Sequence, residues 1–367
     1  MTTILSFLFI ISIIVFIHEL GHFLAAKSVG VRVEKFYLGF NFFGLGIKKT
    51  YNGTEYGLGL FPLGGYVKVA GMIDESMDDN YTGANDEFRS KNTFQKIWIM
   101  SAGVIMNFVL AIAIFAHLTY YQGIYEPDKR AIIGKTYPNK PSEKLGLKEN
   151  DQIIFINGIQ IENWNQMSEQ IQSNPNKTID VKWIRNNIML SGSVITESIP
   201  KLIDDKIVNH GMIGITPILH HKDATIIESF INSFKQTFYL LNEIIMSLKA
   251  LVKGNVSVKE LAGPIMIAKI AGDTASAGFH ALLGLMAFIS INLGFINILP
   301  IPGLDGGHVI MALTEGIIGR ELPLKIKMGI QQIGMLILLM LTVTIIFNDI
   351  QRLVTPSSNT IQEINDE

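Results

Sequence analysis

Four long apolar stretches dominate the hydrophobic pattern of the chain. Each holds few or no charged residues and has about the 20 residues that a helix needs to cross a bilayer. They run over residues 4–26, 97–121, 281–304 and 328–347. The first stretch has no basic segment before it and no small-residue cleavage site after it, so we interpret it as a retained helix rather than a cleaved signal peptide. The pattern predicts an α-helical multi-pass membrane protein with four transmembrane helices.

Between the second and third stretches the pattern changes twice. From 131 to 216, short β-rich runs alternate with turn signals, and Asn157-Gly158 separates two of these runs, which predicts a small α+β domain. From 222 to 253, apolar residues recur every three or four positions, which predicts an amphipathic helix on the membrane surface. A fifth crossing is the alternative, although charged residues such as Glu228 and Glu243 interrupt it.

Composition limits the chemistry that the chain can carry. Of the 367 residues, 48% are hydrophobic and 17% are charged, and this balance is unusual for a soluble protein. The net charge is −2 and no long basic run occurs, so no nucleic-acid-binding surface is indicated. Because the chain has no cysteine, a metal would have to be held by His, Asp, Glu, Asn or main-chain oxygen.

Positive charges predict the orientation of the helices. The 25–96 connection carries nine Lys or Arg residues, whereas the N-terminus carries none and the tail after Phe347 carries only Arg352. Cytoplasmic loops are enriched in Lys and Arg, so the 25–96 segment and the short 305–327 connection are predicted to be cytoplasmic. Residues 122–280 and both termini are then predicted to lie outside.

Two histidines and a glutamate lie inside the first apolar stretch, where ionisable groups are costly. His18 and His22 are four residues apart, so they share one face of a helix and can bind one zinc ion together. Glu19 completes an H-E-x-x-H pattern, in which the glutamate is a general base and not a ligand. The alternative is that both histidines only form hydrogen bonds within a helix bundle.

A catalytic zinc site also needs a third protein ligand. Asp305 is the best candidate, because it follows the Pro-broken end of the third apolar stretch, in INLGFINILPIPGLDGGH at 291–308. The first and third stretches both run inward in the predicted topology, which puts Asp305 at a similar depth to the histidines. An ordinary turn aspartate is the alternative. Asn292 and Asn297 could bind neighbouring helices or donate to a peptide carbonyl.

Four segments together resemble the site-2 protease family of intramembrane zinc metalloproteases (peptidase family M50), specifically its bacterial regulators of sigma-E. They are HELGH, YGLGLFPLGGYVKVAG, LAGPIMIAK and NLGFINILPIPGLDGGH, and they follow the family's order over nearly the whole chain. The resemblance implies zinc as the cofactor and the following site residues: His18, His22 and Asp305 as ligands, Glu19 as catalytic base, and Asn292 and Asn297 as substrate contacts.

The function implied by this resemblance is that of an intramembrane zinc metalloendopeptidase. Its substrates would be transmembrane segments of single-pass membrane proteins, such as trimmed anti-sigma factors or remnant signal peptides, in the bacterial inner membrane. The implied partners are these substrates, trimmed first by another protease, and the lipid bilayer. A membrane scaffold, or a transporter or channel that passes ions or protons along the same polar residues, is the alternative. Neither explains a glutamate next to the first histidine.

The stretch KPSEKLGLKENDQIIFINGIQI resembles a PDZ domain, and the residues available hold only one. The best-known enterobacterial member of the family is similar to a tandem of two. The resemblance implies that this extracytoplasmic domain excludes untrimmed substrates. Capture of substrate C-termini by β-strand addition is the alternative.

The connection after the first stretch is rich in glycine, with nine glycines among the 33 residues 39–71. This composition suits β-hairpins rather than a helix. A peptide must leave its helix to be hydrolysed, and an exposed strand edge could hold it extended. The family likeness implies such a membrane-associated β-loop, in which Gly64 and Gly65 are predicted to bind substrate. Simple cytosolic hairpins are the alternative.

The predicted organisation therefore has eight parts. They are the first transmembrane helix (1–30), the cytoplasmic glycine-rich β-loop region (31–95), the second transmembrane helix (96–121), the PDZ-like domain (128–218), the interfacial helix (222–253), the third (281–304) and fourth (328–348) transmembrane helices, and the tail (349–367).

Overall fold

The structure, a computed structural model, describes residues 2–41, 46–72, 82–203, 206–257, 259 and 261–354. The chain forms two compact units: Met1–Leu118 together with Ile226–Glu367, and Thr119–Thr225. Most of the predicted tail, from 355 onward, lies outside the described residues.

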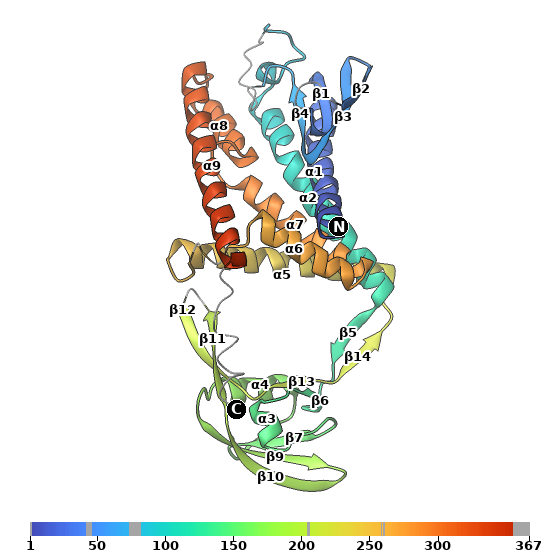
Figure 1. Cartoon of the computed structure of the whole chain (residues 1–367), viewed down its shortest axis with the longest axis vertical. Coiled ribbons are helices and arrows are strands. Elements are labelled where there is room, and N and C mark those ends of the chain that lie inside the picture. The colour runs from blue at the N-terminus through green and yellow to red at the C-terminus, as the bar shows by residue number, and fades with distance from the viewer. Residues whose placement is uncertain are drawn as a thin grey trace. The chain divides into compact units, whose positions relative to one another are not determined.

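Four helices of the described chain are long and apolar enough to cross a membrane (Figure 1). They are α1 (Thr2–Ser28), α2 (Thr93–Gln122), α7 (Phe279–Ile298) and α9 (Leu324–Val354), and they match the four stretches predicted from the sequence. A core of buried apolar residues joins α1, α2 and α7, with Ile10, Ile14, Ala111 and Met286 among its members. Helix α9 exposes many aliphatic side chains, and such a surface suits contact with lipid.

The third apolar stretch departs from its predicted bounds, because α7 ends at Ile298 and not at 304. Pro300 and Pro302 cause this early end, since proline has no N–H to donate and disfavours helical backbone in the residue before it. The chain then enters a further helix, α8 (Asp305–Ile318), where we expected only a connection.

A second unpredicted helix, α6 (Pro264–Ser276), begins at the LAGPIMIAK segment. The buried carboxylate of Asp349, near the end of α9, accepts hydrogen bonds from the main-chain N–H groups of Gly263, Ile265 and Met266 at 3.0–3.1 Å. These are groups that the first turn of a helix leaves without partners. Asp349 therefore fixes the start of α6 to the end of α9.

Helix α5 (Ile226–Val252) matches the predicted amphipathic helix at 222–253 and is not among the four candidate spans of the described chain. Its packed face is small and polar: Ser229, Ser233 and Thr237, spaced by four residues, are buried. Apolar residues such as Ile227 and Phe230 are exposed instead. An outward apolar face suits contact with lipid.

The glycine-rich region forms a four-stranded sheet in the order β2-β3-β1-β4. Its strands are β1 (Val33–Phe40), β2 (Gly46–Tyr51), β3 (Thr54–Gly59) and β4 (Phe61–Val69), and a 3₁₀ turn, η2 (Phe88–Ser90), follows. The β2–β3 hairpin turns at Asn52-Gly53, both with positive φ, as the glycine-rich pattern predicts. Because β1 pairs parallel with β3, the region is a mixed sheet and not hairpins alone. Phe36 of β1 packs edge-on against Phe16 and Phe23 of α1.

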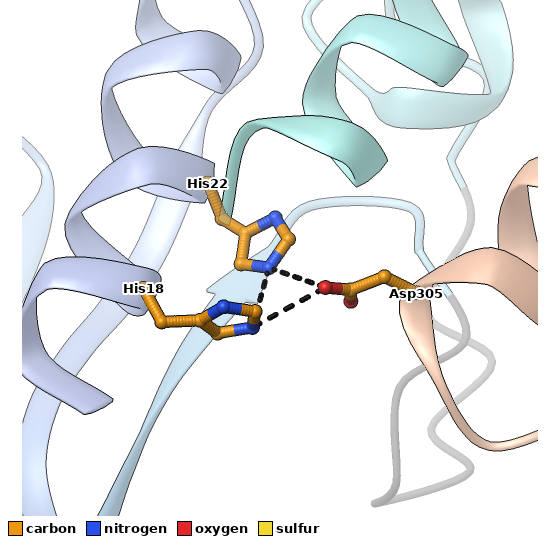
Figure 2. A group of neighbouring side chains, drawn as sticks. All are labelled: His18, His22 and Asp305. Carbon is orange, nitrogen blue, oxygen red and sulfur yellow. Dashed lines mark hydrogen bonds and ion pairs between the residues drawn. The ribbon is translucent and has the colours of Figure 1, made fainter. Parts of the chain in front are cut away.

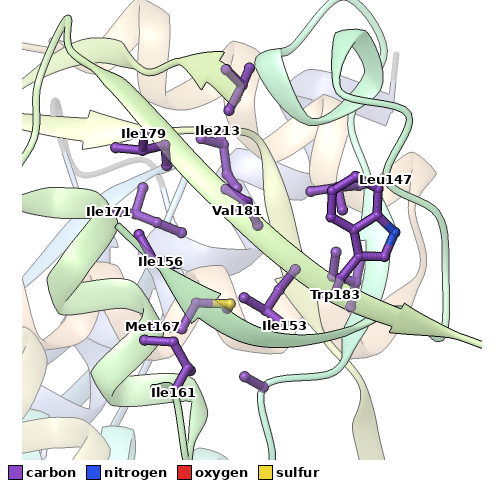
Figure 3. Packing of buried hydrophobic residues seen from close by; sticks show 13 residues of the cluster. Leu147, Ile153, Ile156, Ile161, Met167, Ile171, Ile179, Val181, Trp183 and Ile213 are labelled. Atoms are coloured by element: carbon purple, nitrogen blue, oxygen red, sulfur yellow. The ribbon is translucent and has the colours of Figure 1, made fainter. Parts of the chain in front are cut away.

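The second unit is rich in β-strands around one apolar core (Figure 3). Strands β7 (Gln152–Ile156), β8 (Ile159–Gln160), β9 (Thr178–Arg185) and β10 (Ile188–Ile195) form a sheet in the order β10-β9-β7-β8. The unit also holds three separate two-stranded sheets: β6 (Ile133–Thr136) with β13 (Ile215–Pro217), β11 (Glu197–Ile203) with β12 (Lys206–Met212), and β5 (Ile124–Pro127) with β14 (Leu219–Lys222). Helices α3 (Pro141–Lys144) and α4 (Trp164–Gln172) also belong to this unit.

The core of this unit follows the strand periodicity of the sequence. Ile179, Val181 and Trp183 alternate along β9 and pack against Ile153 and Met167. The predicted strand, Asn-Gly turn and second strand are confirmed as β7, Asn157-Gly158 and β8, and both turn residues have positive φ.

Candidate metal centre

The metal centre starts from two histidines on one face of α1. His18 and His22 are both buried, at 7% and 8% exposure, in a helix that is otherwise almost entirely apolar. Their rings meet edge to face, and the two Nε2 atoms lie 3.2 Å apart (Figure 2). The four-residue spacing therefore directs one nitrogen of each ring to the same point, as the sequence predicts.

Asp305, the first residue of α8, brings a carboxylate to that point (Figure 2). Its Oδ2 atom lies 3.2 Å from His18 Nε2 and 3.4 Å from His22 Nε2. The two glycines that follow allow this approach: a Cβ on Gly306 would lie 2.2 Å from Ile298 O, and one on Gly307 would lie 2.4 Å from Ile301 O. The Leu-Asp-Gly-Gly sequence thus lets α8 begin directly against the end of α7.

The three donor atoms fit a zinc ion. Zinc binds nitrogen and oxygen at about 2.0–2.1 Å in a tetrahedron, whose edges are then roughly 3.3 Å long. The three observed separations are 3.2, 3.2 and 3.4 Å. Asp305 Oδ2 is also buried, and its recorded contacts among the described residues are those with the two histidine nitrogens, so a cation among the three atoms would satisfy the carboxylate. Two imidazoles and one carboxylate form a typical set of three protein ligands in a catalytic zinc site.

Helix α2 completes the surroundings of the two histidines with groups that the sequence analysis did not identify. His22 Nδ1 lies 2.8 Å from the carbonyl oxygen of Ile99, and His18 Nδ1 lies 3.3 Å from Asn107 Nδ2. Between them, Gly103 has no side chain, and a Cβ there would lie 2.4 Å from His22 Nε2. The only sequence signal for these groups is a glycine and an amide spaced by four residues on an apolar helix.

A cavity of about 590 Å³ opens beside the three donor atoms. Glu19, Asn297 and residues 64–69 of β4 line it, together with the three donor residues. Strand β4 passes close to the glutamate, because a Cβ on Gly65 would lie 3.5 Å from Glu19 Cγ and 2.7 Å from Tyr37 O. Gly64 has φ +136°, a conformation that favours glycine. The predicted base and both predicted glycines therefore border one space of the size of a ligand pocket.

The two predicted asparagines differ in where they lie. Asn297 lines the cavity, and its Nδ2 is 3.3 Å from His18 Nε2. The Asn292 side chain instead donates to the carbonyl oxygen of Phe288 in its own helix at 2.9 Å, and it is not among the residues that line the cavity. A substrate contact by Asn292 stays a prediction.

Comparison with known proteins identifies the class. The family model described as "Peptidase family M50" matches residues 6–341, so the chain belongs to this family, the site-2 protease family of zinc metalloproteases. Zinc is the cofactor of its members. The apolar helices and the family together make this protein a membrane metalloprotease.

Two relatives illustrate the similarity. A Campylobacter jejuni protein named "putative zinc metalloprotease Cj1068" is 34% identical over 363 residues, which cover 95% of this chain and 94% of the relative. Zinc metalloprotease RasP of Bacillus licheniformis is 28% identical over 428 residues, which cover 96% of this chain and 100% of the relative. Among solved structures, the PDZ domain of the SdrC-like protein of Listeria monocytogenes is similar over 26% of this chain and 94% of that structure, with 14% identity and a TM-score of 0.21.

Proposed function

We propose that this protein is an intramembrane zinc endopeptidase that hydrolyses peptide bonds in the transmembrane segments of single-pass membrane proteins. The observation that carries the proposal is that Asp305, at the start of α8, lies within 3.4 Å of His18 and His22. The two histidines belong to α1, a helix whose composition suits a membrane, and the donor atoms border a cavity that Glu19 lines. A hydrolytic site placed among apolar helices is costly, and this placement is explained if the peptide to be hydrolysed is itself an apolar membrane segment.

The residues of the centre divide the chemistry among them. His18, His22 and Asp305 would hold the metal, which supplies a Lewis acid that polarises a peptide carbonyl and lowers the pKa of water. The Glu19 carboxylate would take a proton from the attacking water and return it to the nitrogen of the leaving amine. The Asn297 amide lies next to the metal donors, and its N–H group is positioned to donate to the carbonyl oxygen of the substrate as that oxygen gains negative charge.

Strand β4 would hold the substrate extended. It ends the sheet order, so one of its edges has no strand partner among the described residues. A transmembrane segment unwound next to Glu19 could pair with this edge through its main chain, and Gly64 and Gly65 would leave room for the added backbone. The β-sheet region would then be the membrane-associated β-loop expected from the sequence.

The orientation is also part of the proposal. In it, the protein lies in a bacterial inner membrane with the 25–96 connection in the cytoplasm, and with the 128–218 domain and both termini outside. The positive charges of the 25–96 connection support this orientation. The metal centre lies near the cytoplasmic side, because His18 and His22 are close to the end of α1.

The second unit would act as a PDZ-like filter that admits only substrates already trimmed by another protease. The apolar core that its described residues form supports the idea of one folded module between α2 and α5. Replacement of residues 131–216 by a short flexible linker tests the filter against C-terminal capture. Filtering predicts that untrimmed substrates become cleavable, and capture predicts that even trimmed substrates are cut more slowly. A variant that binds zinc but still rejects untrimmed substrates would rule the filter out.

The substrates themselves can be found by comparing membrane proteomes. Cells with the wild-type protein and cells with Glu19→Gln should differ in a small set of single-pass fragments, which accumulate only in the variant. Identical membrane proteomes in the two kinds of cell, grown under the same conditions, would contradict the proposed function.

A further inference from the structure

Asn107 of α2 is a buried polar residue that the proposed chemistry does not use. It has 0% exposure in the middle of an apolar helix, and its Oδ1 atom has no hydrogen-bond partner among the described residues. Its Nδ2 atom lies 3.3 Å from His18 Nδ1. An amide buried among apolar helices with one unsatisfied oxygen is costly, so its position next to a metal-binding ring needs a cause.

The hydrogen on the His18 ring gives that cause. Nε2 faces His22 and Asp305, so it is the atom that would bind zinc through its lone pair. A neutral imidazole that ligates through Nε2 must carry its hydrogen on Nδ1, and this hydrogen needs an acceptor. Among the described residues, the Asn107 carboxamide is the group recorded within hydrogen-bond distance of Nδ1.

The carboxamide can serve both forms of the ring. With Nδ2 toward the ring, Asn107 donates to Nδ1, and the ring hydrogen is on Nε2. A half-turn of the side chain about its Cβ–Cγ bond exchanges the two amide atoms, so that Oδ1 accepts from Nδ1–H and Nε2 is left with its lone pair. The second orientation also gives the unsatisfied oxygen a partner.

We propose that Asn107 is a positioning residue for the metal: it accepts the Nδ1–H hydrogen bond of His18 and so holds the ring with Nε2 directed at the zinc. Helix α2 supplies the matching acceptor for the other ring, since Ile99 O is 2.8 Å from His22 Nδ1. Ile99, Gly103 and Asn107 are spaced by four, so one face of α2 orients both histidines of α1. This inference rests on the zinc site of the proposed function but not on the cleavage of any substrate.

Packing alone does not explain the carboxamide. The neighbouring helix α7 contacts Asn107 through its main chain, where Ser290 Oγ donates to Asn107 O at 2.9 Å, and any residue type at 107 offers that oxygen. Leucine has the same branching at Cγ and carries no polar atom that would need a partner. The distinguishing property of Asn107 is therefore its hydrogen-bonding amide.

Zinc affinity of the full-length protein tests the inference. Asn107→Leu and Asn107→Asp are made in the Glu19→Gln background, purified in lipid nanodiscs, and titrated with zinc against a chelator of known affinity. We expect Asn107→Leu to bind zinc roughly 10- to 100-fold more weakly, the usual cost of losing the hydrogen bond that orients a metal-binding histidine. Asn107→Asp keeps an acceptor and should stay close to the parent affinity. The visible spectrum of bound cobalt should change in Asn107→Leu and remain in Asn107→Asp.

Ser290→Ala provides the matched control, because it loosens the same α2–α7 contact without removing the amide. Its zinc affinity and cobalt spectrum should equal those of the parent. Parent affinity in Asn107→Leu would overturn the inference, and so would equal losses in the Leu and Asp variants or in Ser290→Ala. If these affinities follow the expected order but the wild type cuts no membrane substrate, the proposed function fails while the role of Asn107 stands.

Discussion

Replacing Gly103 by alanine places a methyl group between α2 and the two metal-binding rings. The added Cβ would lie 2.4 Å from His22 Nε2, 2.7 Å from His18 Cε1 and 2.8 Å from His18 Nδ1, all closer than real contacts allow. Both rings are buried between helices and hold each other edge to face, so neither can move aside without leaving the metal position. Overpacking of this kind costs about 1–3 kcal/mol.

If that strain falls on the metal-bound arrangement, zinc affinity drops roughly 5- to 150-fold, at a factor of ten for each 1.4 kcal/mol. Competition with a chelator on the purified protein measures the drop. Gly329→Ala is the matched control, because Gly329 is also inside a helix and its Cβ would meet nothing within 4 Å. Both substitutions replace a helical glycine by alanine and so raise helix propensity equally. The difference in zinc affinity between the two variants therefore reports the contact with the histidines. Equal zinc affinities in the two variants would refute the packing described at the centre.

Three further predictions concern orientation and stability. A cysteine at Asn52 should be labelled only after the cytoplasm is opened, and one at Asn157 should be labelled by an impermeant reagent in intact spheroplasts; the reverse would overturn the orientation. The Arg130 side chain, with His220, lowers the pKa of Asp128. The ionised Asp128 carboxylate should therefore stabilise the β5–β14 pair above about pH 4, and this stabilisation should be lost as the pH falls below that value. Hydrogen exchange of that pair should lose this pH dependence in Asp128→Asn, and an unchanged profile would contradict the assignment. Asp349→Ala removes the acceptor at the start of α6 and should destabilise the protein by roughly 1.5–3 kcal/mol, seen as a lower thermal midpoint; an unchanged midpoint would count against the capping role.

The metal donors could be predicted from the sequence because local geometry determines most of the site. A four-residue spacing directs His18 and His22 to one point on any helix. Asp305 needed a topological argument, namely that the first and third apolar stretches both run inward. The structure agrees, since Oδ2 lies 3.2 Å from His18 Nε2.

The surroundings of the donors could not be predicted in the same way. Ile99 acts through a main-chain oxygen, and Gly103 acts through the absence of a side chain. Their roles depend on the register between α1 and α2, which the apolar pattern of two membrane helices does not specify. Likewise, helical spacing separates Asn292 from Asn297, but only the packing of α7 decides that Asn297 lines the cavity.

The fold was predictable where the pattern was long and regular. The four long helices and the strands around Asn157-Gly158 follow from apolar length and from turn chemistry. The start of α8 depends instead on how the chain packs just after the proline break, since Gly306 must fit against the carbonyl oxygens of Ile298 and Leu299. The start of α6 depends on Asp349, which is distant in sequence.

Cleavage by Glu19→Gln, measured together with its zinc content, tests the proposed mechanism most directly. Wild-type and variant proteins are reconstituted in liposomes with a single-pass substrate that has a short outer segment, and mass spectrometry locates the cut. We expect about one zinc ion per chain in both proteins, cleavage inside the apolar segment by the wild type, and a kcat lower by roughly 10²- to 10⁴-fold in the variant, because only the base is lost. Wild-type cleavage by the zinc-loaded variant, or a cut outside the apolar segment, would contradict the assignment of Glu19 as the base of an intramembrane protease.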